Sequence, residues 1–95
     1  MKVVVELDAA ADVEDAYLWY LEQDRAVAVG FREAFDAAVA LAQEQPRAYE
    51  ILHRATRRVM LRRFPYGVFY RIEGDTMVVV ACMHLTRAPA AWQSR

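Results

Sequence analysis

The chain has 95 residues, one cysteine and nearly balanced charge, with 12 Lys and Arg residues against 13 Asp and Glu residues. This length suits a single domain over residues 1–95 with one modest core. No apolar run approaches the roughly 18 residues that a membrane span requires, and Glu6 and Asp8 interrupt the valine-rich N-terminus, which therefore does not resemble a signal peptide. The lone Cys82 excludes an internal disulfide framework. These features predict a cytoplasmic protein that has no membrane partner.

The balanced total conceals a division of charge along the chain. Residues 1–46 combine three cations with ten acids, and residues 47–95 combine nine cations with three acids, which leaves net charges of −7 and +6. All nine cations after Pro46 are arginine, whose planar guanidinium binds phosphates and carboxylates through paired hydrogen bonds. The pattern favours a specific partner surface.

The first half of the chain predicts one strand and two helices. Residues 2–7 are rich in valine and predict a short strand, which Asp8 follows as a suitable helix N-cap. Helical spacing then connects Val13, Ala16, Tyr17, Tyr20 and Leu21. Residues 23–24 end this helix or begin a tight link.

A second helix is predicted over residues 25–44. Its apolar stripe comprises Val27, Phe31, Ala34, Phe35, Ala38, Leu41 and Ala42. Pro46 ends it, because the residue before a proline disfavours the helical region. Since the link between the two helices is short, they should form an antiparallel hairpin.

After a loop over residues 47–56, the apolar period changes from helical to alternating. Strands are predicted over residues 57–64, 66–72 and 76–85, with a hairpin turn at Gly74-Asp75. The last strand is apolar on both faces and should lie inside the sheet. Pro89 can begin a final helical turn in the tail of residues 88–95.

This order predicts an α+β fold, β-α-α-β-β-β, with the helical hairpin packed on one face of a mostly antiparallel sheet and a short C-terminal tail. The other face is expected to be open and partly lined by arginines.

The sequence lacks the residues that several common kinds of functional site require. The chain has no Gly-rich phosphate loop and no cysteine pair for zinc, and His53 and His84 have no acid at ligand spacing. Ser94, the only serine, lies in the tail. No metal and no cofactor are therefore expected, and classical covalent or metal catalysis is disfavoured.

A cationic and aromatic set remains, and it comprises Arg57, Arg58, Arg62, Arg63, Tyr66, Tyr70, Arg71, His84, Arg87, Trp92 and Arg95. Such residues bind nucleic acids or anchor protein interfaces, although arginines on a strand also serve as a solvated edge. His84 can act as an acid or base, or satisfy a backbone group. Trp92 can pin the tail or bind a ligand. Trp19 lies off its helix stripe and suits an interface or packing on a loop.

Three strings, residues 57–72 (RRVMLRRFPYGVFYRI), 78–84 (VVVACMH) and 87–92 (RAPAAW), resemble the RelE/ParE superfamily of toxins from bacterial type II toxin–antitoxin systems. Upstream, Ala16, Trp19-Tyr20, Ala26, Phe31, Ala34 and Pro46 also fit, so the resemblance spans nearly the whole chain. It implies the same β-α-α-β-β-β fold and a role in growth inhibition and plasmid stabilisation.

The resemblance also implies two kinds of activity. RelE-like toxins cut mRNA in the ribosome, whereas ParE-like toxins poison DNA gyrase. The basic and phenolic residues of the RelE-like nucleases fall here on Gly67, Thr86 and Trp92, none of which supplies an acid, a base or a charge. We therefore expect a ParE-like toxin that binds its target, with gyrase favoured and no catalytic residue assigned.

Two alternatives stay open. The chain can be a ribosome-dependent mRNA endoribonuclease that uses Arg62, Arg63, His84 and Arg87, or a scaffold that has lost toxicity and only binds its antitoxin. In each case the resemblance implies a cognate antitoxin, with which the chain forms a hetero-oligomer, and the antitoxin rather than this chain contacts DNA.

Two groups of contact residues are predicted from these arguments. The expected target contacts are Arg58, Arg62, Arg63, Tyr66, Arg71, His84, Arg87, Trp92 and Arg95. The expected antitoxin contacts are Trp19, Tyr20, Phe31 and Phe35 on the helical hairpin, from which an acidic or amphipathic segment would reach the arginine-rich sheet.

Overall fold

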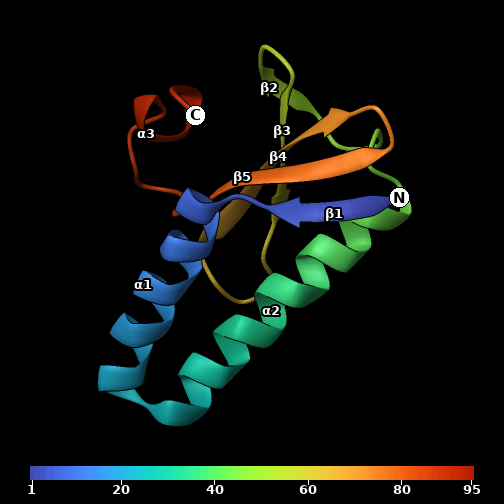
Figure 1. Ribbon diagram of the computed structural model, residues 1–95. Coiled ribbons are helices and arrows are strands. Elements are labelled where there is room, and N and C mark those ends of the chain that lie inside the picture. Colours follow the sequence, from blue (N-terminus) through green and yellow to red (C-terminus); the bar gives the residue numbers. More distant parts are fainter.

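The computed structural model describes residues 1–95 and consists of a five-stranded sheet, a helical hairpin on one of its faces and a short C-terminal helix (Figure 1). The elements are β1 (Lys2–Val5), α1 (Leu7–Gln23), α2 (Arg25–Glu44), β2 (Ile51–His53), β3 (Thr56–Met60), β4 (Tyr66–Glu73), β5 (Thr76–His84) and α3 (Ala90–Gln93). The strand order is β1-β5-β4-β3-β2, with β1 parallel to β5 and the other pairs antiparallel. The predicted α+β fold is confirmed, with β5 inside the sheet and one additional strand.

The additional strand is β2, which lies in the segment that was predicted as a loop. It has three residues and pairs with β3 at the edge of the sheet. The turn that follows contains Arg54 with a φ of 53°, a left-handed conformation that non-glycine residues seldom adopt. A strand of three residues is too short to show an alternating pattern, so the sequence could not reveal it.

The chain leaves the sheet two residues earlier than predicted. The N–H of Glu6 still donates to the carbonyl of Val79, but the carbonyl of Glu6 already accepts from the N–H of Ala10. Leu7 therefore begins α1, and Asp8 lies in its first turn rather than at the N-cap. The α2 limits are confirmed at Arg25 and Glu44, and Asp24 caps this helix by accepting from the N–H groups of Ala26 and Val27.

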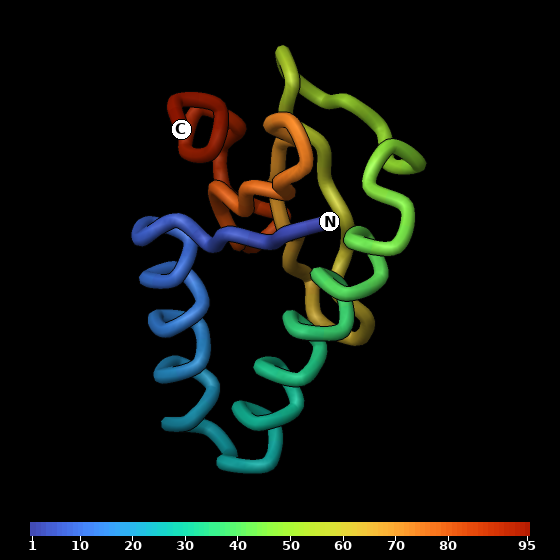
Figure 2. The backbone as a smooth tube through the Cα atoms, turned by 45° about the vertical axis from the view of Figure 1, so that its right-hand side comes forward, coloured from blue at the N-terminus to red at the C-terminus, as the bar shows by residue number.

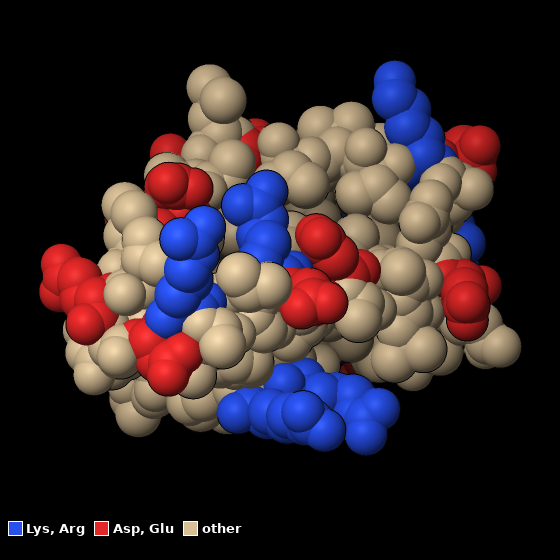
Figure 3. Space-filling view, turned by 90° about the horizontal axis from the view of Figure 1, so that it is seen from below, with Lys and Arg blue, Asp and Glu red and all other residues tan.

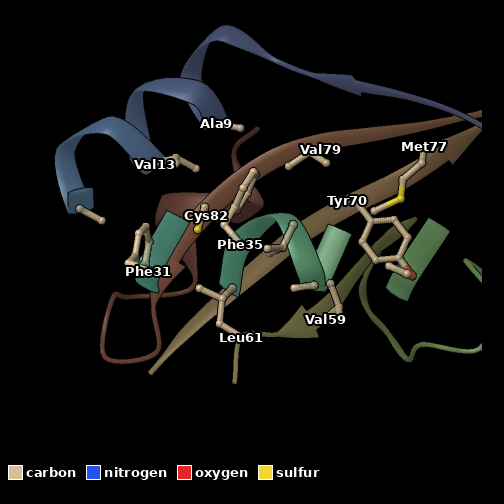
Figure 4. Close-up of a cluster of buried hydrophobic side chains, with 14 residues drawn as sticks. Ala9, Val13, Phe31, Phe35, Val59, Leu61, Tyr70, Met77, Val79 and Cys82 are labelled. Atoms are coloured by element: carbon tan, nitrogen blue, oxygen red, sulfur yellow. The ribbon is translucent and has the colours of Figure 1, made fainter. Parts of the chain in front are cut away.

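The two helices are joined at their far ends and diverge toward the sheet, as Figure 2 shows. The core fills the space between them and the inner face of the sheet (Figure 4). Phe31 and Phe35 of α2, with Ala9, Val13 and Ala16 of α1, pack there against the sheet residues Val59, Val68, Tyr70, Met77, Val79 and Cys82. The predicted stripe of α2 is wrong at Val27 and Leu41, which are 40% and 53% exposed.

An aromatic cluster fastens the hairpin to the loop between β3 and β4. The ring of Phe31 lies with its centroid 5.0 Å from that of Tyr66, 5.3 Å from Phe64 and 5.5 Å from Tyr20. Most of these pairs adopt the edge-to-face or tilted arrangements that aromatic quadrupoles favour. Helix and loop therefore hold one relative position.

Polar contacts fix the connection that follows α2. The buried Tyr70 hydroxyl donates to the carbonyl of Pro46 at 2.6 Å, and burial raises the pKa of this phenol. Arg57 donates to the carbonyls of Arg47 and Tyr49, at 3.1 Å and 2.6 Å. Arg57 is thus a structural residue, which removes it from the cationic and aromatic set singled out in the sequence.

The tail covers part of the outer face of the sheet, which was expected to be open. Trp92 stacks on Phe69 with a centroid distance of 4.4 Å and an interplanar angle of 19°. Beyond Val79, where pairing with β1 ends, side chains bind the β5 backbone: Arg95 donates to the carbonyl of Val80 and Asp12 accepts from the N–H of Cys82. Arg95 and Asp12 also form an ion pair at 2.5 Å.

None of the three helices combines the length and the apolarity that crossing a bilayer requires.

Alkaline pH should destabilise the fold through Cys82. Burial, assisted by the charge of Asp12, raises the pKa of this thiol from its ordinary 9.0 to about 12. A raised pKa in the folded state means that its stabilisation is present below about pH 9 and is lost between about pH 9 and pH 12. The free energy of unfolding should fall by up to about 1.4 kcal/mol per pH unit in this window. Urea unfolding as a function of pH measures the slope, and Cys82→Ala should flatten it. Equal slopes for the two proteins would contradict this origin.

The tail should loosen when its ion pair is removed. Arg95→Ala removes the contacts with Asp12 and the Val80 carbonyl, a loss of about 1 kcal/mol for a partly exposed pair. Hydrogen exchange of residues 88–95 should accelerate while the exchange of β4 remains unchanged. Arg47→Ala, which removes an exposed guanidinium that makes no ion pair, serves as the control and should leave the tail protected. Unchanged exchange in the Arg95 variant would show that Trp92 alone holds the tail.

Candidate functional site

Two loops meet at one end of the sheet. Residues 61–65 connect β3 to β4, and residues 85–89 connect β5 to α3. The N–H of Leu85 in one loop donates to the carbonyl of Pro65 in the other at 2.9 Å, and Tyr66 pairs with His84 across the adjoining strand ends. Side chains that are about 20 residues apart in sequence therefore share one surface, which we call the loop end of the sheet.

Three exposed arginines lie at the loop end, and none of them forms an ion pair within the protein. They are Arg62, Arg63 and Arg87. Arg63 has a φ of 70°, so this loop holds a non-glycine residue in the left-handed region. Figure 3, which views the molecule from below relative to Figure 1, shows one dense group of basic side chains at the rim of that face, with other basic side chains among acidic ones.

His84 is held in a defined orientation beside these arginines. Its Nδ1 accepts from the backbone N–H of Thr86 at 3.1 Å and lies 2.8 Å from the Thr86 hydroxyl. Its ring meets the ring of Tyr66 edge-to-face, with centroids 5.2 Å apart. Tyr66 remains a neutral phenol, because burial and then the neighbouring Tyr20 raise its pKa. The predicted contacts Tyr66, His84 and Arg87 thus lie together.

Arg58 lies on the outer face of the sheet instead. Its stem passes over Gly67 so closely that a Cβ at this position would come within 2.8 Å of the Arg58 Cδ. Arg58 is half-buried and has no carboxylate partner. The lack of a side chain at residue 67 therefore makes room for the cation of the adjacent strand.

Three other predicted target contacts are occupied by internal interactions. Arg71 forms ion pairs with Glu6, at 3.0 Å, and with Glu73. Arg95 is paired with Asp12, and Trp92 is buried against Phe69. The prediction of an open face partly lined by arginines is thus corrected, because intramolecular carboxylates pair with Arg71 and Arg95 and the tail covers part of that face.

The predicted antitoxin contacts also divide. Trp19 is exposed and Tyr20 half-buried, but Phe31 and Phe35 lie in the core and offer no surface. The error came from treating the apolar positions of α2 as one stripe. A second stripe at residues 27, 30, 34, 37 and 41 repeats with helical spacing and would have identified the outer face.

This second stripe lines two adjoining grooves of about 620 Å³ and 240 Å³ between α2 and the segment from β3 into its loop. Met60 and Phe64 contribute apolar surface, and Arg62 borders both grooves. Arg63, Asp24 and Glu33 complete the larger one. We call the two together the α2 groove.

A separate groove of about 270 Å³ lies between α1 and the ends of β4 and β5. Trp19, Tyr66, His84 and Arg87 line it, and so do Asp12 and Asp15, which the sequence had not singled out as site residues. Their spacing of three residues places them on one side of α1, but nothing in the sequence indicates what that side faces. We call this hollow the α1 groove.

No group of three His, Cys, Asp or Glu side chains converges in a way that would hold a metal ion. The three positions on which the nuclease residues of the resemblance fall have other roles. Gly67 lies under Arg58, Thr86 binds His84, and Trp92 packs on Phe69. The arrangement offers cations, an oriented imidazole and apolar grooves, which suit the binding of a macromolecule.

Comparisons with known proteins identify the fold and the family of the chain. A search of curated proteins finds no match for the sequence. The solved structure titled "Chromosomal ParDE TA system from P. aeruginosa" matches with a TM-score of 0.79 and 18% identity, covering 88% of this chain and 95% of that one. At that identity the match shows the fold alone. The family model for the "ParE toxin of type II toxin-antitoxin system, parDE" matches residues 3–89, and the chain therefore belongs to the ParE toxin family.

Proposed function

We propose that this chain inhibits bacterial growth in the cytoplasm by binding a protein target, and that this target is DNA gyrase. The observation that carries the proposal is the loop end of the sheet, where Arg62, Arg63 and Arg87 are exposed and unpaired; Arg87 lines the α1 groove, and Arg62 and Arg63 line the α2 groove. Membership of the ParE toxin family supports it. Aromatic and arginine side chains at the edge of a groove are the residue types that dominate protein interfaces.

The residues near these arginines favour binding over catalysis. Cleavage of RNA without a metal requires an acid, a base and a charge at the scissile phosphate. Gly67, Thr86 and Trp92 carry no such group. A ribosome-dependent endoribonuclease remains the second candidate, because Arg62, Arg63, His84 and Arg87 all lie at the loop end.

For the antitoxin we propose the α2 groove as the binding site. Its floor consists of small and apolar side chains, so the backbone of a partner helix can approach closely. Arg62 and Arg63 lie on one side of it, which favours an acidic edge on the partner. An amphipathic segment that folds on binding would bury Val27, Leu41 and Met60, all of which are exposed in the free chain. Apolar burial would supply most of the affinity, and the arginines would set orientation.

Replacement of Arg63 tests the proposed target site without weakening the fold. Arg63→Gly removes the cation and also the left-handed strain at a φ of 70°, so the protein should become more stable by about 1 kcal/mol. Inhibition of gyrase supercoiling by the purified variant should nevertheless weaken by about tenfold, the loss typical of a contributing interface arginine.

A matched control exists in the same chain. Arg54, with a φ of 53°, lies in the β2–β3 turn, at the opposite end of β3 from the loop end. Arg54→Gly should give a similar gain in thermal stability with full inhibition of gyrase. If the wild-type protein leaves supercoiling unaffected but cleaves mRNA in programmed ribosomes, gyrase is not the target and the second candidate replaces it.

The antitoxin proposal is tested on the exposed side of α2. Leu41→Glu places a charge in the α2 groove and should weaken antitoxin binding at least about tenfold, because the carboxylate must be desolvated. Val29→Glu is the control, since Val29 is similarly exposed on α2 but lies outside the groove. Isothermal titration with the purified antitoxin measures both. Equal losses in the two variants would place the antitoxin elsewhere on the hairpin.

A further inference from the structure

The α1 groove is built from two walls that differ in charge. On α1, Asp15 and Trp19 lie one helical turn apart, and the small Ala16 between them leaves space above the buried Cys82. The opposite wall consists of Tyr66, His84 and Arg87. The hollow exists because a small helical residue faces the end of β5.

One unpaired charge of each sign borders this hollow. Asp12 is already used, because its carboxylate accepts from Arg95 and from the N–H of Cys82. Asp15 and Arg87 form no ion pair. A nucleic-acid backbone carries only negative charge and would be repelled by Asp15. A polypeptide can present both signs within a few residues.

His84 adds a directed hydrogen-bond donor to the wall of Arg87. A backbone N–H can only donate, so the bond from Thr86 requires an unprotonated Nδ1 and places the ring proton on Nε2. No acceptor within the protein binds Nε2. Since His84 lines the groove, an acceptor on a bound partner can satisfy this N–H.

Trp19 completes the wall that α1 forms. Its indole is 56% exposed, and its ring is supported edge-to-face by Tyr20 at 5.0 Å. A carboxylate and an indole one turn apart suit an ammonium or guanidinium group, which gains an ion pair from the first and a cation–π contact from the second.

We propose that the α1 groove binds a polypeptide segment of the target protein that carries a basic and an acidic side chain close together. The basic side chain pairs with Asp15 and packs on Trp19. The acidic side chain accepts from the guanidinium of Arg87 and from Nε2–H of His84. The proposal rests on the proposed function, since the partner is the protein target, and it adds the chemistry of the segment that the toxin recognises.

Neutral substitutions on each wall test the two charges. Asp15→Asn and Arg87→Gln should each weaken binding to gyrase, and inhibition of supercoiling, by about tenfold. Their controls are Glu14→Gln and Arg32→Gln, which remove exposed charges that do not line the α1 groove. Both controls should behave like the wild-type protein, and all four variants should retain the thermal stability of the wild-type protein.

Two substitutions of His84 separate its roles. The amide of Asn can replace Nδ1 and keep the bond to the N–H of Thr86, whereas the longer Gln can place an N–H near the position of Nε2. His84→Gln should retain most of the affinity and His84→Asn should lose it. The reverse order would show that the loop, and not the donor, matters, and would overturn the role given to His84.

A second measurement is independent of gyrase. The indole N–H resonance of Trp19 is followed by NMR while the folded toxin is titrated with blocked helical peptides that carry an Arg and a Glu one turn apart, only the Arg, or only the Glu. A short single-stranded RNA is the fourth probe. The peptide with both charges should shift the resonance at concentrations about tenfold lower than the other probes, and Asp15→Asn should abolish the difference.

The outcomes separate the two proposals. Full inhibition of gyrase by the Asp15 and Arg87 variants, or a larger NMR response to RNA than to the peptide with both charges, would overturn the groove proposal. If the wild-type toxin does not bind gyrase but the NMR result is as expected, the proposed target fails and the groove proposal stands. No response to any peptide would overturn it.

Discussion

The aromatic contact around Phe31 is the constraint on which the functional surface depends. Its ring is fully buried and meets Tyr20 from α1, Phe64 from the β3–β4 loop and Tyr66 from the start of β4. One side chain therefore sets the position of the hairpin, the loop and the strand end relative to one another. The loop presents Arg62 and Arg63, and Tyr66 supports the imidazole of His84. These charged groups are thus carried on an apolar base that is already packed, which reduces the conformational entropy lost when a partner binds.

Two different surfaces arise from one helical hairpin because its helices face the sheet in different ways. α2 buries Phe31, Phe35 and Ala38 and presents a second apolar side to the α2 groove. α1 buries fewer large side chains and borders the α1 groove with a carboxylate and an indole. The apolar character of one groove suits an amphipathic helix, and the mixed charge of the other suits a polar segment. Arg62 and Arg63 line the α2 groove and Arg87 lines the α1 groove, on two loops joined by the Leu85–Pro65 hydrogen bond, so a partner in one groove would lie near a partner in the other.

The fold was largely predictable because the spacing of apolar residues indicates directly which segments are helices and which are strands. The limits of α2, the Gly74-Asp75 turn and the interior position of β5 all followed from spacing and turn chemistry. The three-residue β2 was too short to detect, and β3 ends at Met60 although the strand was predicted to continue to residue 64. The site was less predictable for a physical reason. Whether an arginine is free or paired depends on carboxylates far away in sequence, such as Asp12 for Arg95 and Glu6 for Arg71. Likewise, spacing alone places Phe31 and Leu41 on related turns of α2, but only the packed sheet decides that the first is buried and the second exposed.

The second apolar side of α2 affects how the chain behaves in the cell before a partner binds it. A newly made molecule displays Val27, Leu41 and Met60 to water, and such surfaces attract other incompletely covered chains and the chaperones that hold them. Yield in a recombinant host should therefore depend on whether a protecting polypeptide is translated alongside. The apolar side of α2 that we propose as the antitoxin site therefore also favours self-association of the free chain.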